Sequence, residues 1–436
     1  MRDFLPEDVR RRHYVIGVIA DVYEGYGFEP LETPAVENIE TLLGKYGEEG
    51  DKLLFKILRR GEEGKLGEAD LALRYDLTVP LARVVAECRA KLPKFFKRYQ
   101  VQPVWRADRP QKGRFREFYQ CDVDAIGSRS MVVETEMLAA ATDVLARLGF
   151  TDFVIRLNHR RALSGVLDAS GVATGQHEAV LIALDKLDKI GPDGVAGELA
   201  ERGVAKSGAF ALLDACGALD ESPANDVILA RLARHLHAHA AGVAALDELR
   251  QILSLCEATS AAGRVRLDPS LARGLSYYTG AIMEITVPDL AGSLAGGGRY
   301  DNLIGMFLGA DVPACGISLG LERILVVMSE RDMFPPAVAK TAADIMLTVW
   351  SGERLSDTLA LAALLRKGSL RVDVYPEADK IGKQFKYASS RGVPFVAVVG
   401  DDELARGDVA IKNLATGEQT AVPRDQVVAF LRAAKN

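Results

Sequence analysis

Four arginines occur in sequence contexts where an arginine is unusual. Two flank a loop that follows an apolar segment, one lies in a stretch with glycine and two tyrosines, and one lies inside an apolar strand–helix junction: Arg106, Arg114, Arg273 and Arg323. An arginine rarely points into a core unless a carboxylate or a phosphate pairs with it. For each one alone, a structural ion pair explains the position as well as function does. The four together favour a polyphosphate site, because phosphoryl displacement needs positive groups fixed around the phosphate oxygens before reaction begins.

A second set of residues combines acids, an amide and hydroxyl groups. Its members are Asp76 and Thr78 in RYDLTVP, Gln120 and Asp124 in FYQCDVD, and the adjacent Tyr277 and Tyr278. We expect each of the first two pairs to share one face of a strand, because the two residues are an even number of positions apart. Such a face suits an ammonium group and a weakly basic ring, although a solvated sheet face has the same spacing.

The composition indicates a soluble globular protein with more than one domain. The chain has 436 residues, of which 48% are hydrophobic and 26% are charged, and a formal net charge of −6. No apolar run is long enough to span a bilayer, and the charged start MRDFLPEDVRRR lacks a signal core, so we expect a cytoplasmic protein without a membrane partner. Ten basic residues between Arg89 and Arg116, against Asp108 alone, alternate with aromatic residues and favour an anionic ligand.

Several other chemistries are not supported by the sequence. The five cysteines have no CxxC spacing, so they predict reduced, mostly buried thiols. His235, His237 and His239 have no carboxylate to complete a metal site, and we interpret them as an exposed helix face. The glycine-rich AGGGRYD contains no lysine and does not fit a phosphate-binding loop of the P-loop type. We therefore expect no protein-bound metal.

Hydrophobic periodicity divides the first part of the chain into helices and antiparallel strands. It predicts helices over 7–27, 80–90 and 131–148, a hairpin whose arms are KFFKRYQVQPVWRAD and FREFYQCDVDAIG, and strands over 264–267 and 277–287. The segment CGISLGLERILVVM reads as a strand that leads into a helix. These elements predict an α+β domain with an antiparallel sheet over 1–328.

Two segments differ in character from this domain. Residues 160–262 are rich in Ala, Leu, Asp and Lys and predict a helical insertion. After a linker over 329–342, residues 343–436 alternate between strands and helices, as in a small α/β domain.

At these residues the chain resembles histidyl-tRNA synthetases, a family of class II aminoacyl-tRNA synthetases. Pro34 in LETPAVE resembles motif 1, VWRAD with RPQKGR and FREF resembles motif 2, and GISLGLERI resembles motif 3. LARGLSYYTG at 271–280 and AGGGRYD at 295–301 resemble the signatures of the histidine enzymes. The resemblance covers nearly the whole chain and implies that the last domain binds the anticodon.

The resemblance also implies a role for each matching residue. Arg106 would hold the α-phosphate of ATP and the histidine carboxylate, and Arg273 would contact the α-phosphate from the other side. Arg114 and Arg323 would hold the outer phosphates. Asp108 would contact the adenine side of ATP. Asp76, Thr78 and Gln120 would bind the α-ammonium group, Asp124 and Tyr278 the imidazole, and Tyr277 and Tyr300 would line the pocket. Gln111 and Lys112 lie in the loop that approaches the acceptor end of tRNA in this family.

The implied activity is ATP-dependent formation of histidyl-adenylate from L-histidine, with Mg²⁺, and transfer to tRNA(His) by a homodimer. Ser276 departs from the family, which usually has an acid in RGLDYYTG. The chief alternative is the histidine-sensing regulatory paralogue of ATP phosphoribosyltransferase, which normally lacks the last domain and tends to lose the phosphate-binding arginines. A synthetase for proline, threonine or glycine is a second alternative, but those enzymes lack LARGLSYYTG.

Overall fold

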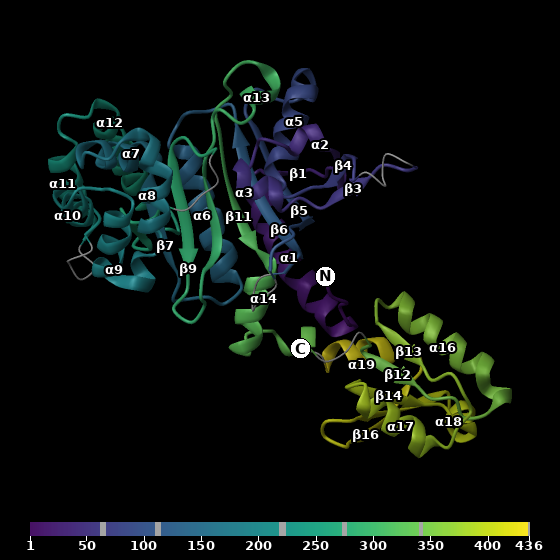
Figure 1. Ribbon diagram of the computed structural model, residues 1–436. Coiled ribbons are helices and arrows are strands. Elements are labelled where there is room, and N and C mark those ends of the chain that lie inside the picture. The colour runs from purple at the N-terminus through teal and green to yellow at the C-terminus, as the bar shows by residue number, and fades with distance from the viewer. Residues whose placement is uncertain (62–66, 110–114, 218–223, 273–276, 340–342, 435–436) are drawn as a thin grey trace. The chain divides into compact units, whose positions relative to one another are not determined.

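The computed structural model describes residues 1–61, 67–109, 115–217, 224–272, 277–339 and 343–434 (Figure 1). The chain divides into two compact units. The first contains Met1–Asp3 and Arg12–Met333, and the second contains Phe4–Arg11 and Phe334–Asn436. Among the described residues, none of the helices is both long and apolar enough to cross a membrane.

An eight-stranded sheet forms the centre of the first unit. Its two longest strands, β5 (Phe96–Trp105) and β6 (Glu117–Ile126), form the predicted antiparallel hairpin. Three further strands extend the antiparallel part beyond β6: β11 (Ala314–Gly320), β10 (Ser293–Arg299) and β9 (Ala281–Thr286). Shorter strands at the two edges complete the order β1-β5-β6-β11-β10-β9-β7-β8. At one edge, β1 (Glu29–Pro30) runs parallel to β5. At the other edge, β7 (Val154–His159) runs antiparallel to β9, and β8 (Val265–Leu267) runs parallel to β7. The predicted antiparallel fold class is therefore confirmed.

Amphipathic helices bury their apolar faces in the first unit. The helix α1 (Pro6–Gly25) buries Val15, Ile19 and Val22, and it ends at Gly25 because Gly27 adopts a left-handed conformation (φ 76°). The helix α6 (Val132–Arg147) packs against β6 and β11, and α14 (Leu321–Glu330) follows directly from β11, as predicted. These helices hold the central strands in place.

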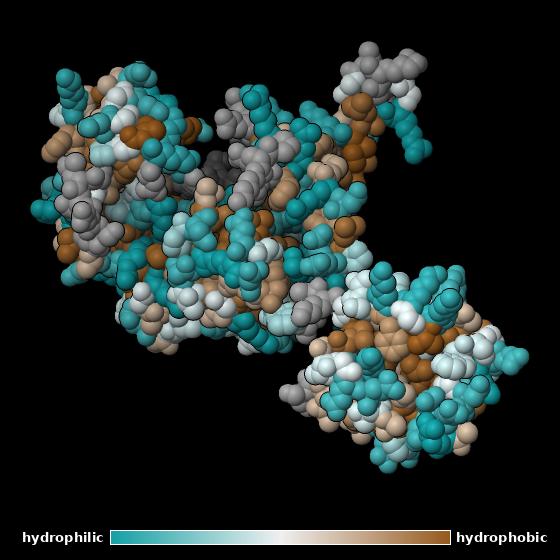
Figure 2. Space-filling view, turned by 90° about the horizontal axis from the view of Figure 1, so that it is seen from below, coloured by the Kyte–Doolittle hydropathy of each residue, from teal (hydrophilic) through white to brown (hydrophobic). Residues whose placement is uncertain are grey.

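The chain segment between β1 and β5 forms a second, three-stranded sheet. Its strands are ordered β2 (Val36–Asn38), β4 (Ala69–Leu73) and β3 (Lys56–Leu58), and they are accompanied by α2 (Ile39–Leu42) and α3 (Gly47–Lys52). Ile57 and Leu58 on β3 are exposed. Figure 2 shows apolar residues on the surface where this sheet projects from the first unit.

The prediction that Asp76 and Thr78 share a strand face was wrong. The strand β4 ends at Leu73, and Thr78 is the first residue of α5 (Thr78–Cys88), which a short 3-10 turn (Arg89–Lys91) extends. Asp76 Oδ1 accepts a hydrogen bond from the backbone N–H of Val79 at 3.0 Å. The carboxylate thus satisfies a free donor in the first helical turn, which favours a helix start over a continued strand.

Helices fill most of the segment between β7 and β8. They are α7 (Arg160–Ala169), α8 (His177–Leu184), α9 (Leu187–Glu201), α10 (Lys206–Ala215), α11 (Asn225–Leu236) and α12 (Ala240–Cys256), with a 3-10 turn over Thr174–Gln176. The three clustered histidines do not share one exposed helix face, which corrects our interpretation. His235 lies in the last turn of α11 and pairs with Asp214, whereas His239 accepts a hydrogen bond at the start of α12 and pairs with Asp168.

The second unit contains a five-stranded sheet in the order β13-β12-β14-β15-β16. The predicted alternation is present in β12 (Ile345–Leu347), α16 (Leu355–Lys367), β13 (Val372–Val374), α17 (Ile381–Ser390), β14 (Phe395–Val398), β15 (Asp408–Asn413) and α19 (Val427–Ala433). Four short elements were not predicted: α15 (Pro336–Ala339) within the expected linker, a 3-10 turn (Gly352–Arg354), α18 (Asp401–Arg406) and β16 (Gln419–Pro423). The three strands that come first in sequence run parallel, and the last two are antiparallel.

Candidate active site

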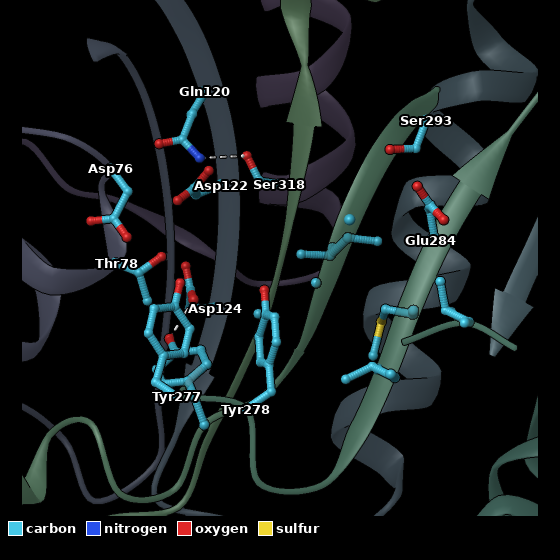
Figure 3. A pocket seen from close by; sticks show the side chains of 18 of the residues that line it. Asp76, Thr78, Gln120, Asp122, Asp124, Tyr277, Tyr278, Glu284, Ser293 and Ser318 are labelled. Atoms are coloured by element: carbon cyan, nitrogen blue, oxygen red, sulfur yellow. Dashed lines mark hydrogen bonds between the residues drawn. The ribbon is translucent and has the colours of Figure 1, made fainter. Parts of the chain in front are cut away.

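An inner cavity of about 310 Å³ lies in the first unit, over the face of the sheet formed by β6, β11, β10 and β9 (Figure 3). Most of the polar residues singled out from the sequence line it: Asp76, Thr78, Arg106, Gln120, Asp124, Tyr277, Tyr278, Tyr300 and Arg323. Gln120 and Asp124 share the cavity face of β6, as the even spacing predicted. The start of α5 and the residues that precede β9 supply the rest of one wall.

Asp76 is fully buried and held by two hydrogen bonds to the same oxygen. The Tyr46 hydroxyl donates to Asp76 Oδ1 at 3.0 Å, and the Val79 N–H donates to it at 3.0 Å. Burial raises the pKa of this carboxyl group above its ordinary value, although the two hydrogen bonds and Arg106 oppose the shift. The other oxygen, Oδ2, is buried without a hydrogen-bond partner among the described residues.

Asp124 is held by a tyrosine and a buried arginine. The Tyr300 hydroxyl donates to Asp124 Oδ1, and Arg98 Nη2 lies 2.8 Å from Oδ2. Arg98 is 0% exposed, so this member of the predicted basic patch lies behind the cavity instead of on the surface. Burial raises the pKa of Asp124, and the Arg98 charge lowers it. The arginine therefore favours the ionised carboxylate inside a buried site.

The polar part of the inner cavity has more hydrogen-bond acceptors than donors. In the part of the chain that the structure describes, four buried oxygens on the cavity walls have no hydrogen-bond partner: Asp76 Oδ2, Gln120 Oε1, Asp122 Oδ1 and Asp124 Oδ2, although the last of these has an ion pair with Arg98. The Gln120 amide donates instead to Ser318 Oγ at 3.2 Å. Because unpaired buried acceptors destabilise a fold, this arrangement fits a ligand with several N–H donors.

Three tyrosine rings form the apolar wall of the cavity. The Tyr277 ring lies 5.1 Å from that of Tyr278 and 5.9 Å from that of Tyr300, in edge-to-face arrangements. Burial raises the pKa of all three phenols, so their hydroxyls remain protonated and able to donate at neutral pH. The wall therefore combines a flat apolar surface with hydroxyl groups.

The glycines of AGGGRYD belong to strand β10 and keep the sheet face open. A Cβ on Gly297 would lie 2.2 Å from the carbonyl oxygen of Gly316, so no side chain fits there. Gly296 has only a distant neighbour and lines both cavities of this region. The run of glycines thus leaves bare backbone beneath the space that a ligand would occupy.

A larger outer cavity of about 810 Å³ shares Arg106, Gln120, Ser293, Gly296, Ser318 and Arg323 with the inner one. Arg106 donates from Nε to the Tyr75 carbonyl at 3.1 Å and stacks over the Tyr75 ring at 4.3 Å. No carboxylate among the described residues forms an ion pair with Arg106. Arg323 Nη1 donates to the Ser293 carbonyl at 2.6 Å. Two guanidinium groups therefore stand where the two cavities meet.

Asp108 also lines the outer cavity. Five other residues of the sequence analysis, Arg114, Arg273, Gln111, Lys112 and Ser276, lie outside the described residues. Five charged residues of the two cavities were not predicted from the sequence: Asp122, Glu284, Asp185, Lys189 and Glu322. Asp122 could have been found, because it shares the even spacing of Gln120 and Asp124. Asp185 and Lys189 come from the helical segment, where no local pattern distinguishes them from a solvated helix face.

Comparison with known protein families gives two matches that together cover most of the chain. Residues 1–324 match the model of histidyl-tRNA synthetases, and residues 345–434 match that of an anticodon binding domain. The chain belongs to the histidyl-tRNA synthetase family. The expected family and fold class are therefore confirmed, including the nature of the last domain.

Relatives of this histidyl-tRNA synthetase family member are similar over nearly their full lengths. The histidine–tRNA ligase of Porphyromonas gingivalis is 44% identical, with 98% of this chain and 96% of the relative covered, and that of Flavobacterium johnsoniae is 41% identical, with 97% and 95% covered. The crystal structure of histidyl-tRNA synthetase from Nostoc sp. PCC 7120 is 30% identical, with a TM-score of 0.86 over 99% of this chain and 97% of that one.

Proposed function

We propose that the chain activates L-histidine with ATP to form histidyl-adenylate and transfers the histidyl group to the 3′ end of tRNA(His). The observation that carries this proposal is the junction of two chemically different cavities. The inner one is rich in hydrogen-bond acceptors, which suits an amino acid with an ammonium group and an imidazole ring. The outer one meets it at Arg106 and Arg323, which suits a polyphosphate.

In this proposal the histidine lies along β6. Asp76, Thr78 and Gln120 bind the α-ammonium group, whose three N–H donors match these three groups. Asp124 and the Tyr278 hydroxyl bind the imidazole, and Tyr277 and Tyr300 close the pocket around the ring. Arg98 behind Asp124 supports this assignment, because its charge lowers the pKa of that buried carboxyl group and favours the ionised form, which accepts an N–H.

The ATP lies in the outer cavity. Arg106 binds the α-phosphate and the histidine carboxylate, Arg323 binds the outer phosphates, and Asp108 contacts the adenine side. Arg106 has no ion pair with a carboxylate among the described residues and lies where the two cavities meet, which supports its role. For Arg114 and Arg273 the support is the sequence resemblance alone.

Mg²⁺ accompanies ATP in this proposal. Glu322 lines the outer cavity, and its carboxylate would hold Mg²⁺, which is commonly bound by one or two carboxylates together with substrate phosphates. When bound, the ion neutralises part of the phosphate charge.

The chemistry needs positioning more than a reactive side chain. The histidine carboxylate attacks the α-phosphorus in line, the bond to the bridging oxygen breaks, and pyrophosphate leaves. Arg106 holds both reacting groups, so it brings them together and stabilises the charge that develops between them. The terminal ribose hydroxyl of tRNA then attacks the carbonyl carbon of the adenylate, and AMP leaves. Gln111 and Lys112 approach the acceptor end in this step.

Three further features complete the proposal. The second unit binds the anticodon region of the tRNA, as its family match supports.

The chain forms a homodimer in the cytoplasm, and the exposed apolar residues Val36, Ile57 and Leu58 support a subunit interface on the small sheet. A sedimentation experiment that gives only monomers at micromolar concentration would contradict the dimer.

Histidine-dependent exchange of labelled pyrophosphate into ATP tests the proposed function. Purified protein is expected to catalyse exchange with histidine and not with proline, threonine or glycine. Absence of exchange together with histidine binding would favour the regulatory paralogue, and exchange with another amino acid would favour another synthetase. The anticodon-domain match and the two cavity arginines argue for the synthetase.

A further inference from the structure

Asp122 is a buried cavity residue to which the proposed function assigns no role. It lies on β6 between Gln120 and Asp124 and faces the same side of the sheet, and it is 3% exposed. Figure 3 shows its carboxyl group near Ser318 of β11, the strand paired with β6. Its position therefore places it among the residues proposed to bind histidine.

The contacts of Asp122 leave one oxygen available. Asp122 Oδ1 is buried and has no hydrogen-bond partner among the described residues, whereas Oδ2 lies 4.0 Å from Arg98 Nη2. Arg98 is closer to Asp124, at 2.8 Å. Arg98 is thus engaged mainly by the neighbouring carboxylate, and a buried acceptor at Asp122 remains available to a ligand.

The charges around Asp122 favour a donor from the substrate. Arg98 on β5 is the described cation that lowers its pKa, whereas Asp124 on β6 and Asp76 before α5 contribute negative charge. The hydroxyl of Ser318 on β11 donates to it, and the phenol of Tyr278 lies near enough to be influenced by it. Burial, as the largest cause, and the charge of Asp124 raise the pKa of Asp122 to about 7, although Arg98 lowers it. A ligand N–H would relieve this excess of negative charge.

We propose that Asp122 is a further specificity-determining residue, which accepts a hydrogen bond from the imidazole ring of histidine beside Asp124. This inference rests on the proposed function. Asp76, Thr78 and Gln120 already match the three donors of the α-ammonium group, so the ring is the part of the substrate left for Asp122. Side chains two positions apart on a strand are about 6.8 Å apart, so Asp122 and Asp124 approach a ring between them from different directions.

The pKa of an imidazole ring is close to the raised pKa of Asp122. An imidazole has an ordinary pKa of about 6.5, which is close to that of Asp122. A ring nitrogen and the Asp122 carboxyl group can therefore share one proton near neutral pH, and the hydrogen bond persists whichever group carries it. An amino acid with an apolar side chain of similar size would leave both carboxyl groups unpaired, which gives the pocket its selectivity.

The variant Asp122→Asn tests the proposal in the full-length protein. We expect the KM for histidine in pyrophosphate exchange to rise by about tenfold or more, with the KM for ATP changed less than about twofold. Asp122→Glu, which keeps a carboxylate, should recover part of the loss. The control is Asp143→Asn, which removes a carboxylate that accepts a hydrogen bond from Tyr26 and does not line the cavity; its KM for histidine should equal that of the wild type.

Two further measurements separate binding of the ring from other roles. Imidazolepropionate has the ring and lacks the ammonium group, so its inhibition constant should rise with Asp122→Asn by the same factor as the KM for histidine. An unchanged inhibition constant would overturn the ring assignment. The melting temperature should stay the same or rise, and a fall of several degrees with equal loss for histidine and ATP would indicate a structural role and overturn the proposal. Wild-type protein without histidine-dependent exchange would refute the proposed function itself, whereas normal exchange with an unchanged KM in Asp122→Asn would refute this inference alone.

Discussion

Gly316 on β11 lies directly opposite Asp124 on β6, and a Cβ atom at Gly316 would be 1.9 Å from Asp124 Oδ1. The carboxyl group therefore occupies the space that any other residue at position 316 would fill. The absence of a side chain at Gly316 places Asp124 against Tyr300 and Arg98.

Gly316→Ala should weaken histidine binding more than ATP binding. The new methyl group would displace the Asp124 carboxylate, and misplacing one contact of a bound substrate commonly lowers activity by about tenfold to a hundredfold. Pyrophosphate exchange measured against each substrate in turn would check this prediction. Gly17→Ala is a suitable control, because Gly17 lies in α1 and a methyl group there would have no described neighbour within 4 Å. Equal losses for both substrates would contradict the role of Gly316.

Tyr46→Phe should raise the KM for histidine by roughly threefold to tenfold. The variant removes the hydroxyl that donates to Asp76 Oδ1 and keeps the ring, which lies 4.6 Å from that of Tyr75 in a tilted arrangement. Loss of one hydrogen bond of this kind corresponds to about 1 kcal/mol. Tyr26→Phe removes a comparable hydroxyl outside the cavity and should leave the KM unchanged. If both variants behave alike, Tyr46 does not position Asp76 for the substrate.

Arg106→Ala should lower the rate of adenylate formation by about a hundredfold to a thousandfold, the usual effect of removing one group that stabilises transition-state charge. Arg106→Lys should recover only part of the rate, because an ammonium group cannot bind a carboxylate and a phosphate with the planar geometry of a guanidinium. Stability should change little, because Arg106 forms no ion pair with a described carboxylate and its Nε donates only to the backbone carbonyl of Tyr75. A rapid-quench measurement of adenylate checks the rate, and thermal unfolding checks the fold. A normal rate in Arg106→Ala would remove this arginine from the mechanism.

The stability of the substrate-free protein should fall as the pH rises from about 4 to about 7, in part because of Asp122. Its pKa in the folded protein, about 7, lies above the ordinary value of 3.8. The folded state therefore binds the proton more tightly, and the stabilisation from that proton is lost as the group ionises. Asp122→Asn should reduce the difference in unfolding free energy between pH 5 and pH 8, by an amount on the order of a few kcal/mol at most. Denaturant titrations at both pH values would check this, and identical pH dependence in the two proteins would count against a buried, titrating Asp122.

Periodic elements of this fold were predictable from the sequence, whereas short and context-dependent ones were not. The β5–β6 hairpin and the helix α6 have long alternating or helical patterns, and the structure confirms both. The edge strand β16 and the short helix α18 have five and six residues, which is too few for a periodic signal. At Asp76 the hydrogen bond to Val79 decided between strand and helix, and strand spacing alone does not contain that information.

The sequence predicted most of the residues that line the candidate site, but it did not predict how their charges are paired. Gln120, Asp124, Arg106 and Arg323 do line adjoining cavities. Arg98, however, was counted among the basic residues expected to meet an anionic ligand, whereas it pairs with Asp124. Its burial depends on the hairpin register, which places Arg98 opposite Asp124, and the sequence between the two arms does not fix that register. Because Arg98 pairs with Asp124 behind the cavity, the inner cavity has more hydrogen-bond acceptors than donors. The sequence alone could not predict this imbalance.

The strand β6 carries Gln120, Asp122 and Asp124 on alternate positions of a ten-residue run. A shift of the whole strand by one residue, as a deletion or insertion before Gln120 would cause, would turn all three side chains to the opposite side of the sheet at once. Substitutions in this strand can therefore alter selectivity one contact at a time, whereas a change in its length removes amino-acid recognition altogether. Variation in natural or engineered relatives should accordingly appear here as exchanged side chains and never as gaps.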